Sequence, residues 1–256
     1  MIANSEPIAR PELIPGIYNY CDSWCERCAF TTRCRSYQLQ QVNDLPKPDP
    51  NASLVEQLTE ALNMTKQYIE TLNRETDNFS ALTPGEQTTL EEAALSRHQK
   101  IKDHPVATLA TSYLKLTGSW LFIEKGLLER AGEQQLHEVQ LGIRTEDEAM
   151  VGLNKLSDAY DQIRWYRTLI PVKTKAALRA VDEQTNDKCV LSYYNGKAKL
   201  VLVSIDRSLA AWQTVMDHFP EATDDLLDAL SLLNQLSRRI ETLFPNARNF
   251  YRPGLD

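Results

Sequence analysis

The sequence predicts an all-α protein, a multi-helix bundle with an N-terminal cysteine-rich metal-binding loop. Three observations lead to this prediction. Apolar residues recur at helical spacing through most of the chain after residue 53, no segment alternates with period two for long, and four of the five cysteines fall between residues 21 and 34. A chain of 256 residues can bury a full hydrophobic core without disulfides.

A proline-rich stretch divides the chain near its N-terminus. Three prolines alternate with other residues between positions 46 and 50, and prolines at this spacing cannot form a helix but fit a short extended spacer. The sequence therefore predicts a cysteine-rich metal-binding segment over residues 1–45, a spacer over 46–52 and a helical bundle domain over 53–256.

Capping boxes indicate where three of the helices begin. In each box a hydroxyl residue is followed three positions later by glutamate, so that two backbone donors of the first turn are satisfied reciprocally. The three pairs are Ser53 with Glu56, Thr83 with Glu86, and Thr145 with Glu148. They predict one helix over 53–78, a second over 84–101 and a third after residue 145.

Prolines and low charge define the middle of the predicted bundle. After Pro105, a stretch with few charges predicts one long central helix that reaches about Leu128. The helix that follows Thr145 meets Pro171, where the missing N–H donor should break or kink it. Residues 182–196 are predicted to form a loop.

Two further helices complete the predicted set, over residues 197–219 and 223–244, and each ends just before a proline. Residues 199–205 could pass for a buried strand. The run continues directly into a helical pattern, however, and no partner strand is visible. We therefore expect about six or seven helices in all.

Cys21, Cys25, Cys28 and Cys34 form the most informative pattern in the chain. Thiolates are soft ligands that favour zinc or iron–sulfur clusters, and four of them within one loop can close around a single centre. The sequence therefore predicts that these four cysteines bind one metal cofactor together.

The spacing of the cysteines favours a 4Fe-4S cluster, with zinc as the alternative. Zinc sites with four cysteines are usually built from two separate C-x2-C knuckles, and this loop has only one. A four-iron cluster presents iron corners that are more widely separated, so a short loop with uneven spacing can wrap around it.

Part of the loop, from Cys25 to Cys34 with Phe30 after the middle cysteine, resembles the C-x2-C-x5-C cluster motif of RecB-type and CRISPR-associated nucleases. The resemblance covers ten residues and implies an iron–sulfur cluster. In that family the fourth cysteine lies far upstream, beyond a nuclease core, whereas here it is Cys21. The acidic-lysine strand motif of that fold is also missing, so nuclease activity is not implied.

The spacing Cys21-x3-Cys25-x2-Cys28 also resembles the three-cysteine signature of radical SAM enzymes. That family leaves one iron open for S-adenosylmethionine and is built from repeated strand–helix units. This chain has a fourth cysteine close by and no such repeats. The second resemblance therefore supports a cluster and not the radical chemistry.

Aromatic and basic residues lie among the cysteines. We expect the aromatic residues to shield the centre and to anchor the loop to the bundle; they are Trp24, Phe30 and Tyr37. Three arginines could balance the charge of a thiolate cluster or be solvated; they are Arg27, Arg33 and Arg35.

Two other features were weighed as sites. Asp158, Tyr160, Asp161 and Arg164 are close together on one predicted helix. They could bind a polar ligand or relay a proton, or Asp161 and Arg164 could form an exposed ion pair. Cys189 lies in a predicted loop without a histidine or carboxylate motif and is interpreted as an incidental thiol.

Charge and composition limit the class of partner. A net charge of −7 argues against nucleic acid or an anionic membrane as the main partner. A run of basic residues over 164–179 is interpreted as a solvated helix face. Residues 1–20 contain neither a secretory signal nor a membrane span, so we expect a cytoplasmic protein in which the thiols stay reduced.

These observations lead to two functional hypotheses. The first is a cytoplasmic metalloprotein, an interaction or accessory protein whose four-cysteine site stabilises the N-terminal segment while the helical surface receives a protein partner. The alternative is an iron–sulfur oxidoreductase or electron carrier. No catalytic residue is assigned from the sequence.

Overall fold

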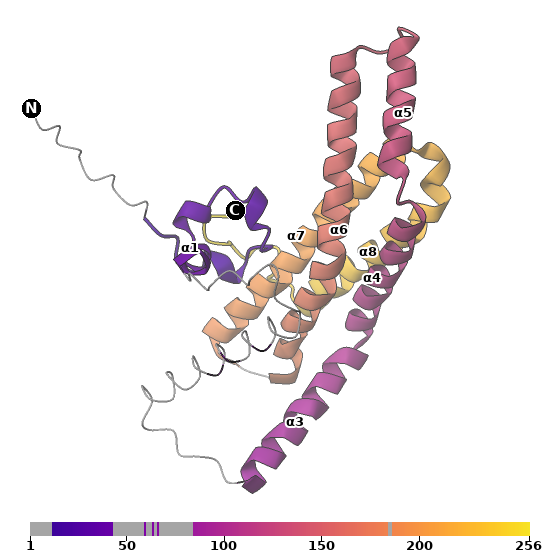
Figure 1. Ribbon diagram of the computed structural model, residues 1–256. Helices are drawn as coiled ribbons and strands as arrows, with labels where there is room; N and C mark the ends of the chain where they lie inside the picture. The colour runs from indigo at the N-terminus through magenta and orange to yellow at the C-terminus, as the bar shows by residue number, and fades with distance from the viewer. Residues whose placement is uncertain (1–11, 43–58, 60–62, 64–65, 67–83, 184–185) are drawn as a thin grey trace, which may run out of the picture.

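The computed structural model describes residues 12–42, 59, 63, 66, 84–183 and 186–256. These described residues contain seven α-helices and no strand, which confirms the all-α prediction for them (Figure 1). The helices are α1 (Arg35–Val42), α3 (Pro84–Asp103), α4 (Pro105–Ile123), α5 (Leu127–Gln140), α6 (Glu146–Glu183), α7 (Lys188–His218) and α8 (Thr223–Leu243). The described residues also contain four short 3-10 turns: η1 (Ile17–Asn19), η2 (Cys25–Arg27) and η3 (Thr31–Arg33) precede α1, and η4 (Pro220–Ala222) lies between α7 and α8.

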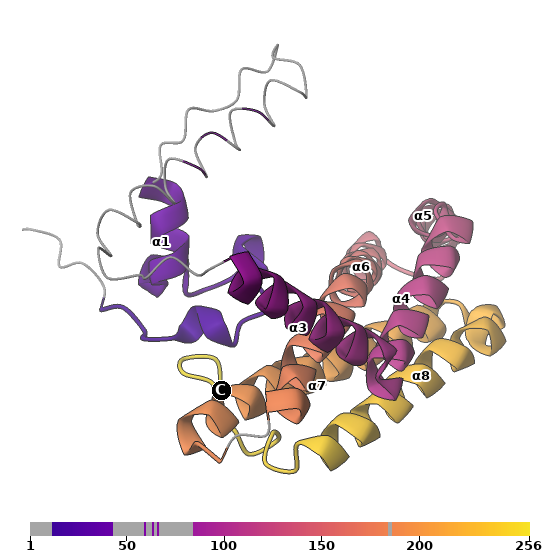
Figure 2. The ribbon, with the colours of Figure 1, turned by 90° about the horizontal axis from the view of Figure 1, so that it is seen from below.

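The core of the bundle lies between α6 and α7, the two longest helices, with α4 and α8 packed against them (Figures 1 and 2). Trp212 of α7 is fully buried and contacts Trp120 of α4 edge-on, with ring centroids 4.9 Å apart. Ile163 and Ile170 on α6 are also fully buried. This apolar core supports the helices without any contribution from the cysteines.

Several predicted helix boundaries are confirmed. Helix α3 begins at Pro84, and α8 covers nearly all of the range predicted for the last helix. The capping box before α6 is formed in both directions: the Thr145 N–H donates to Oε2 of Glu148 (2.9 Å), and the Glu148 N–H donates to Oγ1 of Thr145 (3.3 Å). Local capping chemistry was therefore a reliable guide where it was present.

Two boundary predictions are wrong, that of the central helix and that of the loop over residues 182–196. The central helix does not reach Leu128, because α4 ends at Ile123 and α5 begins after Gly126. Of the two outcomes expected at Pro171, a break does not occur, because α6 continues through the proline. The proline gives up one backbone hydrogen bond, while burial of Ile170 before it and of Ala177 and Leu178 after it keeps the helix together.

The loop predicted over residues 182–196 is much shorter in the structure. Helix α7 begins at Lys188 because the side chain of Asp187 caps it, accepting a hydrogen bond from the Cys189 N–H (2.7 Å). The helix predicted over 53–78, the spacer over 46–52 and two of the three capping boxes lie outside the described residues.

The N-terminal cysteines and the C-terminus lie at one side of the bundle, beside α7 (Figures 1 and 2). Among the described residues, no helix combines the length and the apolar character needed to cross a bilayer.

Candidate metal centre

Residues 12–34, called here the cysteine segment, carry the predicted ligands. The segment follows short 3-10 turns instead of an α-helix: Cys25 begins η2, and Cys34 follows η3. All four of its cysteines are free thiols and are partly exposed. A local backbone with tight turns lets side chains that are close in sequence face one another.

The four thiols lie near enough to one another for their charges to interact. Burial raises the pKa of the Cys25 thiol, and the charges of Cys21, Cys28 and Cys34 raise it further. The backbone N–H of Phe30 donates to Sγ of Cys28 (3.4 Å), a bond that favours a thiolate or a metal-bound sulfur. Within the described residues, no group of three or more His, Cys, Asp or Glu side chains is arranged to hold a single metal ion.

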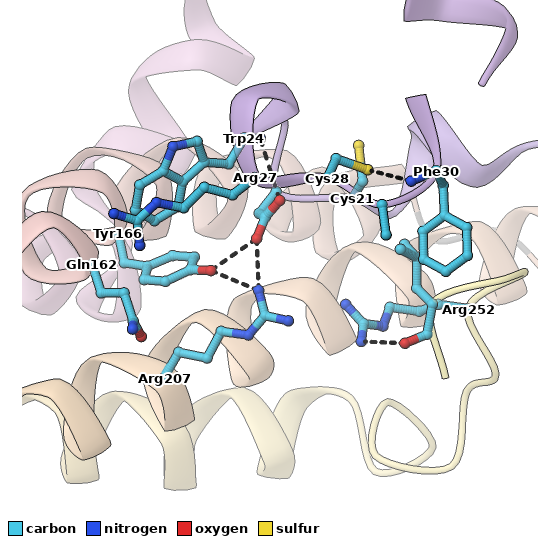
Figure 3. A pocket seen from close by; sticks show the side chains of 12 residues that line it. Cys21, Trp24, Arg27, Cys28, Phe30, Gln162, Tyr166, Arg207 and Arg252 are labelled. Carbon is cyan, nitrogen blue, oxygen red and sulfur yellow. Dashed lines mark hydrogen bonds and ion pairs between the residues drawn. The ribbon is translucent and has the colours of Figure 1, made fainter. Parts of the chain in front are cut away.

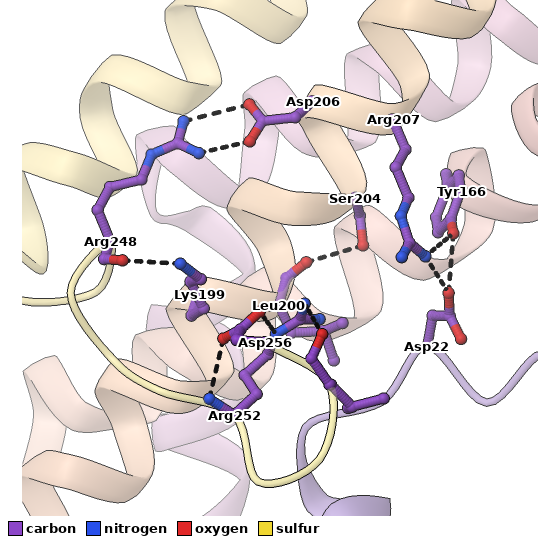
Figure 4. A network of polar contacts seen from close by, with 11 residues as sticks. Asp22, Tyr166, Lys199, Leu200, Ser204, Asp206, Arg207, Arg248, Arg252 and Asp256 are labelled. Carbon is purple, nitrogen blue, oxygen red and sulfur yellow. Dashed lines mark hydrogen bonds and ion pairs between the residues drawn. The ribbon is translucent and has the colours of Figure 1, made fainter. Parts of the chain in front are cut away.

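Asp22 connects the cysteine segment to the bundle (Figure 4). Its Oδ2 accepts hydrogen bonds from the Tyr166 hydroxyl (2.8 Å) and from Nη1 of Arg207 (2.7 Å), and Arg207 also donates to the Tyr166 oxygen (2.6 Å). Burial raises the pKa of Tyr166 to about 12, so its phenol is a neutral donor. The indole N–H of Trp165 donates to the Asp22 carbonyl (3.0 Å). One residue of the segment thus contacts both α6 and α7.

The residue after Asp22 turns the chain so that the next side chain also meets α6. Ser23 has φ +59°, a left-handed conformation that is uncommon outside glycine. Trp24 stacks on Trp165, with ring centroids 4.9 Å apart and planes 13° apart. A strained backbone of this kind persists where contacts on both sides fix it, and here these contacts are made by Asp22 and Trp24.

Arg27 makes an outer contact with α6. Its two terminal nitrogens bond to Asp158 and Asp161, each at 2.8 Å, and its guanidinium lies 4.3 Å from the centre of the Trp24 ring. The expected ion pair between Asp161 and Arg164 is not formed between these described residues, because the cysteine segment crosses this face of α6 and brings Arg27 to Asp161 instead. The charged groups are well exposed, so the ion pairs contribute little to stability.

A second set of contacts joins the segment to α7 and to the residues after α8. The Tyr20 ring packs on Phe250, with ring centroids 4.8 Å apart, beside Gly196 of α7. A Cβ at position 196 would lie 2.2 Å from the Tyr20 ring and 2.9 Å from the Phe250 ring, so this close approach requires glycine. Lys197 adds a hydrogen bond from Nζ to the Asn19 carbonyl (2.7 Å).

Residues 245–256, called here the C-terminal tail, pack against the cysteine segment. Arg252 is only 6% exposed, and its Nε (3.0 Å) and Nη2 (2.6 Å) both donate to Oδ1 of Asp256 (Figure 4). Gly254 has φ +72°, and a Cβ there would lie 2.8 Å from Ile14. The segment is therefore held between the helices and the tail.

A cavity of about 400 Å³ lies between the cysteine segment, α6, α7 and the tail (Figure 3). Two of the predicted metal ligands and three guanidinium groups reach its walls. These residues are Cys21, Cys28, Arg27, Arg207 and Arg252. Cys25 and Cys34 do not line the cavity, so it lies to one side of the four cysteines.

Sequence reasoning missed Asp22, Tyr166, Arg207 and Arg252. The bonds from Tyr166 and Arg207 to Asp22 span 144 and 185 positions, and no local pattern links such distant residues. The one usable signal is the Trp165–Tyr166 pair within the basic run over 164–179, because both side chains contact the cysteine segment.

The remaining sequence candidates are dispersed over the structure. Arg164 is exposed, whereas Arg167 turns toward Gly118 of α4, so the basic run over 164–179 does not share one face. Cys189 is exposed in the first turn of α7 and not in a loop.

Comparisons of the chain with protein-family models, with curated proteins and with solved structures give no match. The chemistry of the site therefore has to be argued from its own residues.

Proposed function

We propose that Cys21, Cys25, Cys28 and Cys34 together bind one 4Fe-4S cluster, and that this centre fastens the cysteine segment to the helical bundle. The observation that carries the proposal is that four free, partly exposed thiols lie within residues 21–34, on one segment of short 3-10 turns. A bound metal centre displaces the protons of the four thiols and replaces them with metal–sulfur bonds.

The donor types suit the cluster, although the thiols of the described residues are not arranged to hold a single metal ion. All four candidate ligands are soft thiols that are partly accessible, as the assembly of a cluster requires. The N–H of Phe30 supplies Cys28 with the type of hydrogen bond that tunes the reduction potential of cluster sulfurs. Zinc remains the alternative cofactor, because it takes the same ligands in its structural sites.

The position of the ligands in the chain supports a structural role. Cys21 immediately precedes Asp22, and Cys25 immediately follows Trp24, so the two ligands flank two residues that contact α6. A centre that fixes the cysteines would also fix these anchors. We propose on this basis an accessory or interaction protein of the cytoplasm, where thiols stay reduced, with a protein partner on the helical surface.

One observation favours the alternative hypothesis of an iron–sulfur oxidoreductase or electron carrier. The cavity is lined by Cys21 and Cys28, so a small molecule inside it would lie next to two of the proposed ligands. A bound cluster can supply one-electron chemistry to such a molecule.

Anaerobic purification followed by iron, sulfide and zinc analysis and visible absorption tests the proposal. We expect a brown protein that contains iron and sulfide. A colourless protein loaded with zinc would replace the cluster with the alternative cofactor, and a protein with neither metal would contradict the proposal. A reversible redox couple would favour the electron carrier over the structural role.

A further inference from the structure

The cavity beside the cysteine segment has an asymmetric charge distribution. Arg27, Arg207 and Arg252 line it, but only one carboxylate does, that of Asp22. The carboxylates that pair with Arg27 and Arg252 approach from outside the lining. These outer carboxylates fix the positions of the guanidinium groups. The guanidinium N–H groups that they do not bond are therefore ordered before a ligand binds.

Of the three arginines, Arg207 has the most guanidinium nitrogens without a partner among the described residues. Its Nη1 is taken by Asp22 and Tyr166, while its Nε and Nη2 have no partner among the described residues. These two nitrogens form one edge of the planar guanidinium, and that edge can bind both oxygens of a carboxylate or phosphate at once. Figure 3 shows the Arg207 guanidinium between Tyr166 and Arg252.

Arg252 supplies a donor from the opposite wall. Its side chain is only 7% exposed, and its Nε and Nη2 are fixed by Asp256. Its Nη1 has no partner within the described part of the chain, although the residue lines the cavity. A guanidinium nitrogen that lines a cavity without a partner of this kind can donate a hydrogen bond to a ligand there.

Gln162 completes the polar wall. It lies on α6 one turn before Tyr166, lines the cavity, and makes no hydrogen bond from its amide to any described residue (Figure 3). Phe30 and Leu255 provide apolar wall on the side of the segment and the tail. The volume of about 400 Å³ is in the range of pockets that bind small organic molecules.

We propose that this cavity binds a small organic oxyanion, whose carboxylate or phosphate group lies between Arg207 and Arg252 and whose apolar part contacts Phe30. The guanidinium groups that line the cavity place the anionic group at the arginine side. The proposal rests on the proposed function in one respect, since the metal centre is expected to hold the cysteine segment over the cavity.

Isothermal titration calorimetry with inorganic phosphate and with benzoate, in a Tris chloride buffer, tests the site on the full chain. The two probes distinguish a phosphate from a carboxylate group, and iron is measured in the same samples. We expect at least one probe to bind with a dissociation constant of about 1 mM or tighter.

Two variants locate the site. Arg207→Lys keeps a positive charge that can reach Asp22 but loses the two-nitrogen edge, and should weaken binding about tenfold. Gln162→Leu removes a side chain without other hydrogen bonds among the described residues and should weaken it about threefold. Arg238→Gln, an exposed arginine on α8, is the control for net charge and should leave binding unchanged.

Every outcome is decisive. Protein that contains iron but binds neither probe overturns the oxyanion site and leaves the proposed function standing. Binding without iron supports the site and contradicts the proposed function, and the absence of both contradicts both. Binding that survives Arg207→Lys and Gln162→Leu unchanged also overturns the site. If circular dichroism shows that Arg207→Lys does not fold, Gln162→Leu alone decides.

Discussion

Replacing Asp22 with alanine should release the cysteine segment while leaving the bundle folded. The carboxylate accepts one hydrogen bond from Tyr166 and one charge-assisted bond from Arg207, at 2.8 and 2.7 Å. Tyr166 and Arg207 stay bonded to each other in the variant, so neither is left without a partner. The lost free energy should therefore come mainly from the two bonds themselves.

The magnitude follows from the exposure of the pair. A hydrogen bond to a charged group contributes about 1.5–3 kcal/mol, and the Arg207 side chain is 48% exposed, which reduces its share through solvent screening. We expect a total loss of about 2 kcal/mol, which corresponds to a factor of about thirty in an opening equilibrium. The loss should be local, because Asp22 joins the segment to α6 and α7 and does not join the helices to one another.

Hydrogen exchange followed by mass spectrometry measures this directly. Amides in residues 14–34 should exchange about thirtyfold faster in Asp22→Ala, while those of the buried part of α7 change by less than about twofold. Asp158→Ala is the matched control, since it removes a 63% exposed partner of Arg27 and leaves Asp161 in place. Equal acceleration in the segment and in α7, or none in the segment, would refute the reasoning.

Three further perturbations have predicted outcomes. Gly196→Ala should weaken docking of the segment by about 1–3 kcal/mol despite the better helix propensity of alanine, because its Cβ would clash with Tyr20 and Phe250; faster exchange in residues 14–34 is the readout, and slower exchange would contradict it. The pKa of Tyr166 is raised to about 12 by burial, so the stability it confers is present below pH 10 and is lost as the pH rises through 12; tryptophan fluorescence should report this loss in the wild type and not in Tyr166→Phe. Arg27→Ala should lower the free energy of unfolding by less than about 1 kcal/mol in chemical denaturation, since its ion pairs are exposed. A larger loss would show that these ion pairs stabilise the protein more than their exposure predicts.

The parts of the fold that the sequence predicted correctly depend on local chemistry. The capping box of Thr145 and Glu148 involves residues three positions apart, and the helical stripe of α8 repeats within each turn. Such signals are readable because the interacting residues are close in sequence. The all-α architecture follows from the sum of these local signals.

The errors arise where tertiary packing outweighs a local preference. Pro171 is a helix breaker by its own chemistry, but it lies between buried turns of α6 that pack against α7. Asp187 falls within the loop predicted over residues 182–196 but caps α7, and aspartate is common both in turns and at helix N-caps. Neither outcome could be decided without knowing which surfaces the helix would bury.

The candidate site shows the same division. The four cysteines are visible in the sequence because they lie within one short stretch. Asp22 lies between two of them but gives no sign of its role, because its partners Tyr166 and Arg207 are far away in the chain. The cavity could not be predicted for the same reason, since its walls come from four separate parts of the sequence.

The most direct test of the account is the metal content of the four single cysteine-to-serine variants, purified anaerobically beside the wild type and Cys189→Ser. We expect about four iron and four sulfide per chain in the wild type and in Cys189→Ser, whose thiol is exposed and far from the segment in sequence. Replacement of Cys21, Cys25, Cys28 or Cys34 should each lower the metal content, because all four are proposed to bind one centre. Unchanged metal in two or more of these variants would contradict the account.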